Sequence, residues 1–270
     1  MNLNTITQVK RPGSIEEIEW RDGHAFLAGG TWLFSEPQVA VDTLVDLQSL
    51  GWPALTVSEE GLEIAATCRV VELHDFKGPP GWRAVPLIDQ CIDCFLMSFK
   101  IWNAATIGGN LVMSLPAGAM VSLTAALEGV CTLWPRDGAP RQVPVVDFVT
   151  GMHTNVLQKG ELLRSIFLPA TALRKRFAMR QVSLTRYGRS AALIVGTVDD
   201  GGRDFLLTIS AATPRPVHLR FDALPSAAAL RQAIEQRLPP DAWFHDVHGS
   251  AAYKRHVTFY LAEQIRTELA

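Results

Sequence analysis

Two glycine pairs in this chain have neighbours that could bind a negatively charged group. The first lies in Ala28-Gly-Gly-Thr-Trp-Leu33 and the second in Ala104-Ala-Thr-Ile-Gly-Gly-Asn-Leu111. Glycine allows backbone conformations with φ > 0 and close approach of a ligand to the main chain. Consecutive N–H groups freed in this way form an anion-binding concavity, and Thr31, Thr106 and Asn110 can add side-chain donors. The shared pattern predicts two converging loops that bind one diphosphate.

A tight turn without a ligand is the simpler interpretation of either glycine pair alone. The presence of Thr beside both pairs favours ligand binding over two unrelated turns. The G-x-G-x-x-G fingerprint is absent, so the sequence does not support a Rossmann dinucleotide site. A G-x-S-x-G elbow is absent as well, which leaves a hydrolase triad without an anchor. This pattern fits a protein whose cofactor carries the chemistry.

The cysteines and histidines do not form a recognisable metal-binding pattern. Cys91 and Cys94 have C-x-x-C spacing, but Cys68 and Cys131 do not complete a set of four ligands at recognisable spacing. A cluster or zinc site is possible in principle, but burial as reduced thiols is the favoured interpretation because free Cys behaves as a small apolar residue. The histidines lack companions at ligand spacing. We therefore predict no metal site in this chain.

Composition indicates a soluble globular protein. The chain has 270 residues, of which 48% are hydrophobic and 19% charged, with a formal net charge of −2. This charge gives no reason to expect nucleic acid or an anionic membrane as a partner. No apolar run approaches the roughly 20 residues that a membrane span requires. The first residues lack the basic-then-apolar layout of a signal peptide, so we expect a cytoplasmic location.

Local patterns predict the elements that carry the glycine pairs. A small N-terminal lobe is expected to contain strands at 6–9, 25–28 and 39–46 and a short helix at 14–19. Residues 55–58 and 62–66 have the alternation of a hairpin. Helices are predicted at 67–73, with Thr67 as N-cap, and at 84–99, which leads into the second glycine pair. The almost uncharged helix 119–127 is expected to be buried on all sides. Further strands are predicted at 130–134, 142–146 and 162–168.

The C-terminal part has a different pattern. Residues 169–175 are expected to form a linker. Strands predicted at 177–184, 191–198 and 205–211, with a turn at Tyr187-Gly188, form an antiparallel meander backed by helices at 227–237 and 251–269. The predicted fold class is α+β, with a first domain at 1–169 (lobes 1–54 and 55–169) and a second at 175–270.

Both glycine segments resemble the flavin-binding loops of the FAD-binding (medium) subunit of the xanthine dehydrogenase family of molybdenum hydroxylases. The likeness continues in Val143-Pro-Val-Val-Asp-Phe148, Gly160-Glu-Leu-Leu-Arg-Ser-Ile166 and Ser250-Ala-Ala-Tyr-Lys-Arg-His256. It covers nearly the whole chain in the order of that family. The resemblance implies a two-lobed PCMH-type FAD-binding domain, followed by a smaller domain like that of the carbon monoxide dehydrogenase flavoprotein, with a three-stranded antiparallel sheet backed by helices.

The resemblance also implies a function. FAD in this chain would accept electrons from 2Fe–2S clusters of a small partner subunit, while a large partner subunit holding a molybdenum cofactor oxidises the substrate. The external electron acceptor would be NAD, a quinone or O2. No catalytic residue is expected in this chain. The residues expected to contact FAD are Leu27, Ala28, Gly29, Gly30, Thr31, Trp32, Leu33, Leu96, Ala105, Thr106, Gly109, Asn110, Val112, Gly118, Leu162 and Gln181.

Three positions depart from the family pattern. Trp32 replaces an acid, Gly118-Ala119 replaces Ser-Asp, and Gln181 stands near the place of a basic residue, with Arg180 beside it. Backbone donors do not depend on side-chain identity, so FAD binding is still expected. The departures leave two alternatives open, which are a flavin-free scaffolding subunit of the same kind of complex and a stand-alone flavin oxidase.

Overall fold

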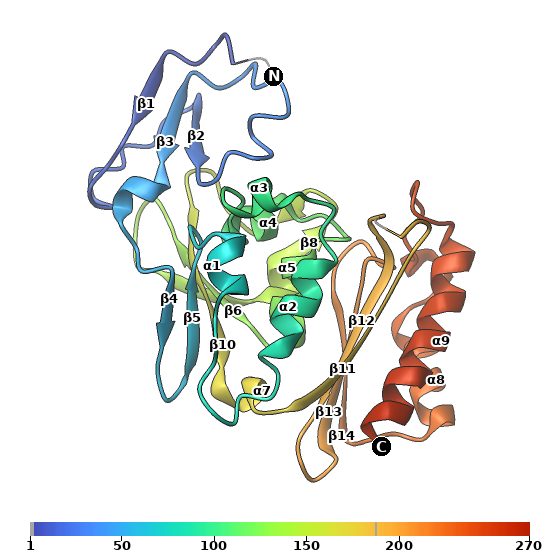
Figure 1. Cartoon of the computed structure of the whole chain (residues 1–270). Coiled ribbons are helices and arrows are strands. Elements are labelled where there is room, and N and C mark those ends of the chain that lie inside the picture. The colour runs from blue at the N-terminus through green and yellow to red at the C-terminus, as the bar shows by residue number, and fades with distance from the viewer. Residues whose placement is uncertain (1–2, 187) are drawn as a thin grey trace.

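The helices and sheets form separate layers in the computed structural model, which describes residues 3–186 and 188–270 (Figure 1). A three-stranded sheet near the N-terminus lies apart from a five-stranded and a four-stranded sheet. Helices of the middle region lie between the two larger sheets, and two C-terminal helices cover the other face of the four-stranded sheet. This is the α+β fold that the sequence predicts.

The N-terminal sheet positions the first glycine pair. Its order is β1-β3-β2, with both pairs parallel, and β2 ends at Leu27, directly before the pair. The predicted helix at 14–19 is wrong, because this segment forms bends and turns. The first turn of a helix fixes about six dihedral angles for one hydrogen bond, so a segment of six residues does not form a stable helix by itself. The elements are β1 (Gln8–Lys10), β2 (His24–Leu27), β3 (Thr43–Asp46) and the 3₁₀ helix η1 (Leu47–Leu50).

The five-stranded sheet is antiparallel and has the order β4-β5-β10-β6-β7. The predicted hairpin is confirmed, since β4 pairs with β5. The central strand β10 joins this hairpin to β6, although both partners are distant in sequence. The strands are β4 (Leu55–Val57), β5 (Gly61–Ala65), β6 (Val130–Trp134), β7 (Arg141–Pro144) and β10 (Leu162–Pro169).

Five helices follow the hairpin, and two of their predicted bounds are wrong. The first begins at Val70 with Arg69 as N-cap, two residues later than Thr67 would give. The helix predicted at 84–99 is too long, because α2 ends at Asp93, residues 95–98 border a cavity, and a separate helix begins only at Phe99. The helices are α1 (Val70–His74), α2 (Pro86–Asp93), α3 (Phe99–Trp102), α4 (Ile107–Met113) and α5 (Ala119–Ala126).

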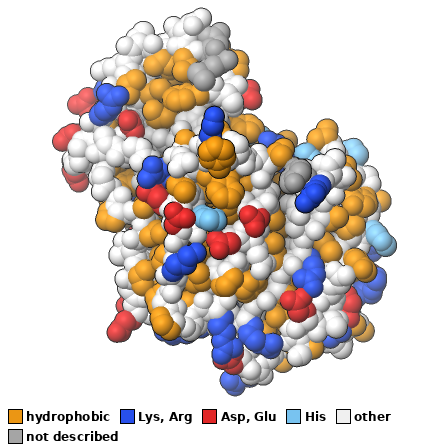
Figure 2. All heavy atoms as spheres, viewed as in Figure 1, with side chains coloured by type: hydrophobic (Ala, Val, Ile, Leu, Met, Phe, Trp, Pro, Cys, Tyr) orange, Lys and Arg blue, Asp and Glu red, His pale blue; other side chains and the backbone are white. Residues whose placement is uncertain are grey.

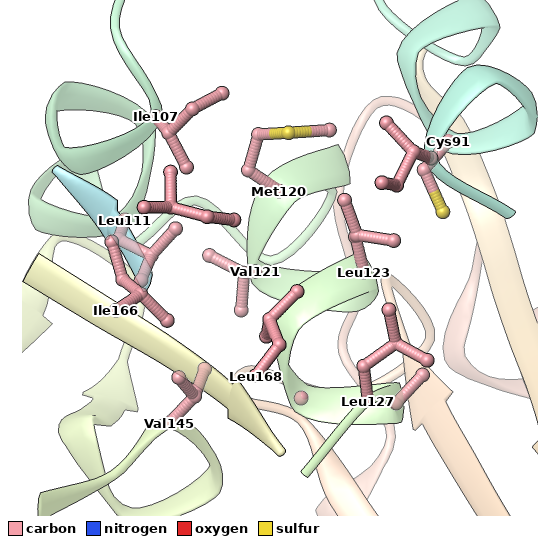
Figure 3. Packing of buried hydrophobic residues seen from close by; sticks show 14 of the residues in the cluster. Cys91, Ile107, Leu111, Met120, Val121, Leu123, Leu127, Val145, Ile166 and Leu168 are labelled. Atoms are coloured by element: carbon pink, nitrogen blue, oxygen red, sulfur yellow. The ribbon is translucent and has the colours of Figure 1, made fainter. Parts of the chain in front are cut away.

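Helix α5 lies in the main hydrophobic core, as its uncharged sequence predicts. All of its residues are buried. Figure 3 shows Met120, Val121 and Leu123 on this helix, close to Ile107 and Leu111 of α4 and to Ile166 and Leu168 of β10. Burial of each such side chain contributes about 1.5–3 kcal/mol to folding. The hydroxyls of Ser122 and Ser210, 2.6 Å apart, connect α5 to the four-stranded sheet. This packing fixes where α5 begins, beside the cavity.

The C-terminal sheet has four strands in the order β11-β12-β13-β14, one more than predicted. The additional strand β14 alternates exposed and buried residues at the sheet edge, and its charged Arg220 and Asp222 hid the strand pattern. Tyr187 of the predicted turn lies outside the described residues. The elements are β11 (Arg176–Ser183), β12 (Ser190–Val198), β13 (Arg203–Ser210), β14 (Val217–Ala223), α8 (Ala227–Arg237), η2 (Pro240–Ala242) and α9 (Ala251–Leu269).

The segment predicted as a linker is packed into the protein. It contains the short helix α7 (Ala170–Leu173), and Leu173 is buried. Lys175, 5% exposed, forms ion pairs with Glu128, in the turn after α5, and with Asp204 of β13. The division into domains at 169–175 stays a prediction. The remaining short elements are α6 (Val145–Phe148), β8 (Val149–Gly151) and β9 (Thr154–Asn155).

Candidate nucleotide-binding cavity

A cavity of about 940 Å³ is lined by the segment that follows β2, by residues between α2 and α5, and by loops of the C-terminal part. Its volume is at the upper end of the roughly 300–1,000 Å³ typical of ligand pockets. Segments from the N-terminal sheet, from α2 to α5, from the β8–β9 turn and from the C-terminal part line it together. The lining includes most of the predicted FAD contacts: Ala28, Gly29, Gly30, Thr31, Trp32, Leu33, Leu96, Ala105, Thr106, Gly109, Asn110, Val112 and Gly118.

Three predicted contacts lie outside this lining. Leu27 is the last residue of β2, and Leu162 is buried in β10, where it pairs with Trp134. The side chain of Gln181 donates a hydrogen bond to the Ser190 hydroxyl over 3.2 Å. Contact of these three residues with FAD stays a prediction.

The two glycine segments meet, as predicted. A Cβ atom on Gly29 would lie 1.9 Å from the carbonyl oxygen of Ala104 and 3.2 Å from Cα of Ala105. Only hydrogen fits between these two pieces of main chain. Gly29 thus allows the turn after β2 to touch the segment that precedes α4.

The first glycine turn presents free amide groups to the cavity. Gly30 has φ +70°, and its carbonyl accepts a hydrogen bond from the amide of Phe34, which closes the turn. Among the described residues, the amides of 29–33 donate to no acceptor in the protein. Buried or half-buried N–H groups normally have a partner, so a row of free ones beside a cavity indicates an anion-binding concavity.

The second glycine pair lies in a helix, so the prediction of a second loop is wrong. Thr106 is the N-cap of α4, and its hydroxyl accepts a hydrogen bond from the Gly109 amide over 3.1 Å. The amides of Ile107 and Gly108 donate to the carbonyls of Cys68 and Ala66. Because these donors already have partners, the second pair adds no free amides of its own to the cavity wall.

Gly108 and Asn110 have structural tasks that the sequence did not reveal. A Cβ on Gly108 would lie 2.5 Å from Cβ of Ala66, so glycine allows α4 to pack on the end of β5. The Asn110 side-chain oxygen accepts a hydrogen bond from the Met120 amide over 3.1 Å, near the start of α5. The NH2 group of the same side chain can still donate to a ligand. Helix α5 therefore begins at the cavity, with its positive dipole end beside Asn110.

Trp32 forms part of the cavity wall. Its ring lies 5.8 Å from the His153 ring, between centroids, and both residues belong to the lining. His153 has φ +54°, and its amide donates to the carbonyl of Ser114, which has φ +49°. Residues other than glycine rarely adopt this conformation, and they do so mostly where the surroundings enforce it. The cavity remains open with Trp32 in place.

Most lining residues that the sequence did not predict lie on irregular segments. They carry no shared motif, and only the fold brings them to one cavity. Figure 2 shows hydrophobic side chains over α3, where the N-terminal sheet meets the rest of the molecule, and Phe99 of α3 is 71% exposed. The additional lining residues include Phe95, Met97, Ile101, Met113, Leu115, Met152, His153, Arg189, Phe244, Asp246, Val247 and His248.

The cysteines do not form a redox or metal site. All of them are free thiols, and burial raises the pKa of Cys68 and Cys131 to about 12. Cys94 borders the cavity, but burial raises its pKa to about 11, so it remains a thiol at neutral pH. The described residues contain no cluster of metal-binding side chains. They also include no helix that could cross a membrane.

Comparison with known proteins specifies the family to which this fold belongs. Residues 7–171, more than half of the chain, match the family described as FAD binding domain in molybdopterin dehydrogenase. The chain belongs to this family. It is thus an FAD-binding subunit of a molybdenum hydroxylase-type oxidoreductase, as the resemblance of its glycine segments predicts.

Individual relatives cover the chain to different extents. Caffeine dehydrogenase subunit beta of Pseudomonas sp. (strain CBB1) is 26% identical over 257 residues, which are 87% of this chain and 82% of that protein. Xanthine dehydrogenase 2 of Arabidopsis thaliana is 29% identical over 125 residues, 44% of this chain but only 9% of that protein. A chain of quinoline 2-oxidoreductase from Pseudomonas putida 86 has the same fold, with a TM-score of 0.76, 17% identity, and coverage of 98% of this chain and 96% of that one.

Proposed function

We propose that this chain holds FAD in the cavity and passes electrons from iron–sulfur clusters of a small partner subunit to an external acceptor. A large partner subunit with a molybdenum cofactor would oxidise the substrate. The family match and the name of the relative as subunit beta of a dehydrogenase support a multi-subunit complex. NAD, a quinone or O2 would serve as acceptor, and a cytoplasmic location belongs to the same proposal.

The observation that carries this proposal is the row of free amides at 29–33 beside the cavity. In the proposed complex these amides bind the diphosphate, which needs several donors in a small space. The NH2 group of Asn110 and the dipole of α5, which also border the cavity, add positive potential. The residues present therefore fit an anionic nucleotide.

The remaining lining suits the aromatic parts of FAD. Leu96, Ala105, Val112 and Met113 offer apolar surface, and Trp32 with His153 offers aromatic surface. When bound, the flavin supplies the exchange of electrons between donor and acceptor. The chain itself orients the cofactor, excludes water from part of its surface and sets the local electrostatic field.

Titration of the full-length apoprotein with FAD tests this proposal. We expect saturable binding at one site per chain, with flavin absorbance bands that shift on binding. A protein that stays colourless after purification and takes up no added FAD would contradict it. Co-purification with a molybdenum-containing large chain and a cysteine-rich small chain tests the complex separately, because FAD binding without such partners would refute only that part.

A further inference from the structure

Arg189 is the only lysine or arginine among the cavity-lining residues that the structure describes. Its side chain is exposed, and no hydrogen bond or ion pair joins it to a described residue. The acidic group of the lining, Asp246, already has a partner, since its Oδ1 lies 2.9 Å from Nζ of the fully buried Lys254. Apart from the histidines, the described part of the cavity wall thus has a single uncompensated charge, and it is positive.

The C-terminal sheet holds Arg189 in place. The residue directly precedes β12, and every residue of that strand is buried. The hydrogen bond from Gln181 to Ser190 joins β11 to β12 at the base of the turn. The free amides at 29–33 follow a strand of a different sheet. The cavity therefore has two separate features that attract negative charge.

FAD has two places where negative charge can lie. The diphosphate is always charged, whereas the flavin ring is neutral when oxidised. Transfer of two electrons from the iron–sulfur donors and uptake of one proton from water leave the reduced ring with one negative charge. The first glycine turn already supplies donors for the diphosphate. Arg189, which precedes a strand of a different sheet, can therefore interact with the negative charge that develops on the ring.

We propose that Arg189 compensates the negative charge of the two-electron-reduced flavin and thereby raises its reduction potential. This inference rests on the proposed binding of FAD. Charged groups near the ring are one of the means by which proteins tune a flavin. A fixed cation favours the charged form of a neighbouring group, and here the charged form is the reduced one.

The test compares Arg189→Gln, Arg189→Lys and the control Arg186→Gln in the full-length chain reconstituted with FAD. Arg186 belongs to the same turn but not to the cavity lining, and its substitution changes net charge equally. The affinity for oxidised FAD is measured by titration, and the midpoint potential by equilibration with redox dyes. We expect Arg189→Gln to weaken the binding of reduced FAD about tenfold relative to that of oxidised FAD. This change lowers the midpoint potential of the bound flavin by about 30 mV. The midpoint potential of Arg189→Lys should be close to that of the original protein because lysine keeps the positive charge. The control Arg186→Gln should have the original midpoint potential.

Two results would overturn the inference. Equal loss of affinity for oxidised and reduced FAD, at constant potential, would place Arg189 at the diphosphate instead. Unchanged affinity and potential would show that Arg189 does not act on the cofactor. If the unsubstituted chain bound no FAD, the proposed function would fail together with this inference, and that outcome is visible before any variant is made.

Discussion

The two glycine pairs share a sequence pattern but use glycine for different purposes. At the first pair, Gly30 takes a left-handed conformation and the following amides stay free beside the cavity. At the second pair, Gly108 lies inside α4 and removes a Cβ that would collide with Ala66. The first pair prepares a binding surface, and the second allows a helix to pack. Similar sequence patterns can thus reflect a need for conformational freedom in one place and a need for space in another.

Substitution of Gly29 should reduce FAD affinity more than any other change considered, because Gly29 is where the two glycine segments touch. In Gly29→Ala the new Cβ would collide with the carbonyl of Ala104, so the turn must move away from α4. A displaced turn cannot present its amides to the same ligand, and we expect FAD affinity to fall about 100-fold, or roughly 2.7 kcal/mol. Fluorescence titration with FAD measures this. Affinity within threefold of the original would show that contact between the segments is unimportant for binding.

Gly108→Ala should act on stability instead of binding. Its Cβ would meet both backbone and side chain of Ala66, and such overpacking destabilises by about 1–3 kcal/mol. Urea unfolding of the apoprotein measures the free energy of unfolding. FAD affinity of the folded variant should stay within about threefold of the original. Loss of affinity without loss of stability would restore the interpretation of this pair as a ligand-binding loop.

Gly30→Ala and Gly202→Ala share a backbone conformation, with φ of +70° and +73°, but only a Cβ on Gly30 would meet a neighbour, the Phe34 ring at 2.6 Å. Gly202→Ala should destabilise by about 1–2 kcal/mol, the penalty of a left-handed residue with a side chain, and Gly30→Ala by more because the Phe34 ring must also move. Only Gly30→Ala should also weaken FAD binding, by about tenfold, since relaxation of the turn redirects its amides. Calorimetric titration checks the affinities, and circular dichroism the melting temperatures. An equal effect of both variants on FAD affinity would contradict the assignment of the first turn.

Thr106→Ala should have the smallest effect. It removes the hydroxyl that accepts the Gly109 amide at the start of α4, which costs about 1 kcal/mol of unfolding free energy. Thr106→Ser keeps this hydroxyl and should remain within about 0.5 kcal/mol of the original protein. Urea unfolding of both variants tests the pair. If serine destabilised as much as alanine, the lost methyl group rather than the N-cap would be responsible.

Much of the fold could be predicted because its patterns are local. The β4–β5 hairpin alternates apolar and polar residues around a glycine turn, and α5 has the uncharged sequence of a fully buried helix. The helices α8 and α9 have the predicted bounds, 227–237 and 251–269, and the structure shows Ser226 and Ser250 as their N-caps. Errors occurred where local and tertiary preferences diverge, as in the split of the helix predicted at 84–99.

The sequence alone determined the hairpin, the buried helix and the family of this protein, because local periodicity and short motifs carry that information. Only the tertiary structure decided which glycine pair has free amides, since the acceptors for the amides of Ile107 and Gly108 lie on Cys68 and Ala66, far away in the chain. It also brought Arg189 and the segment 244–248 to the cavity. Hydrogen-bond partners and cavity neighbours depend on which distant segments pack together, and no local pattern contains that information.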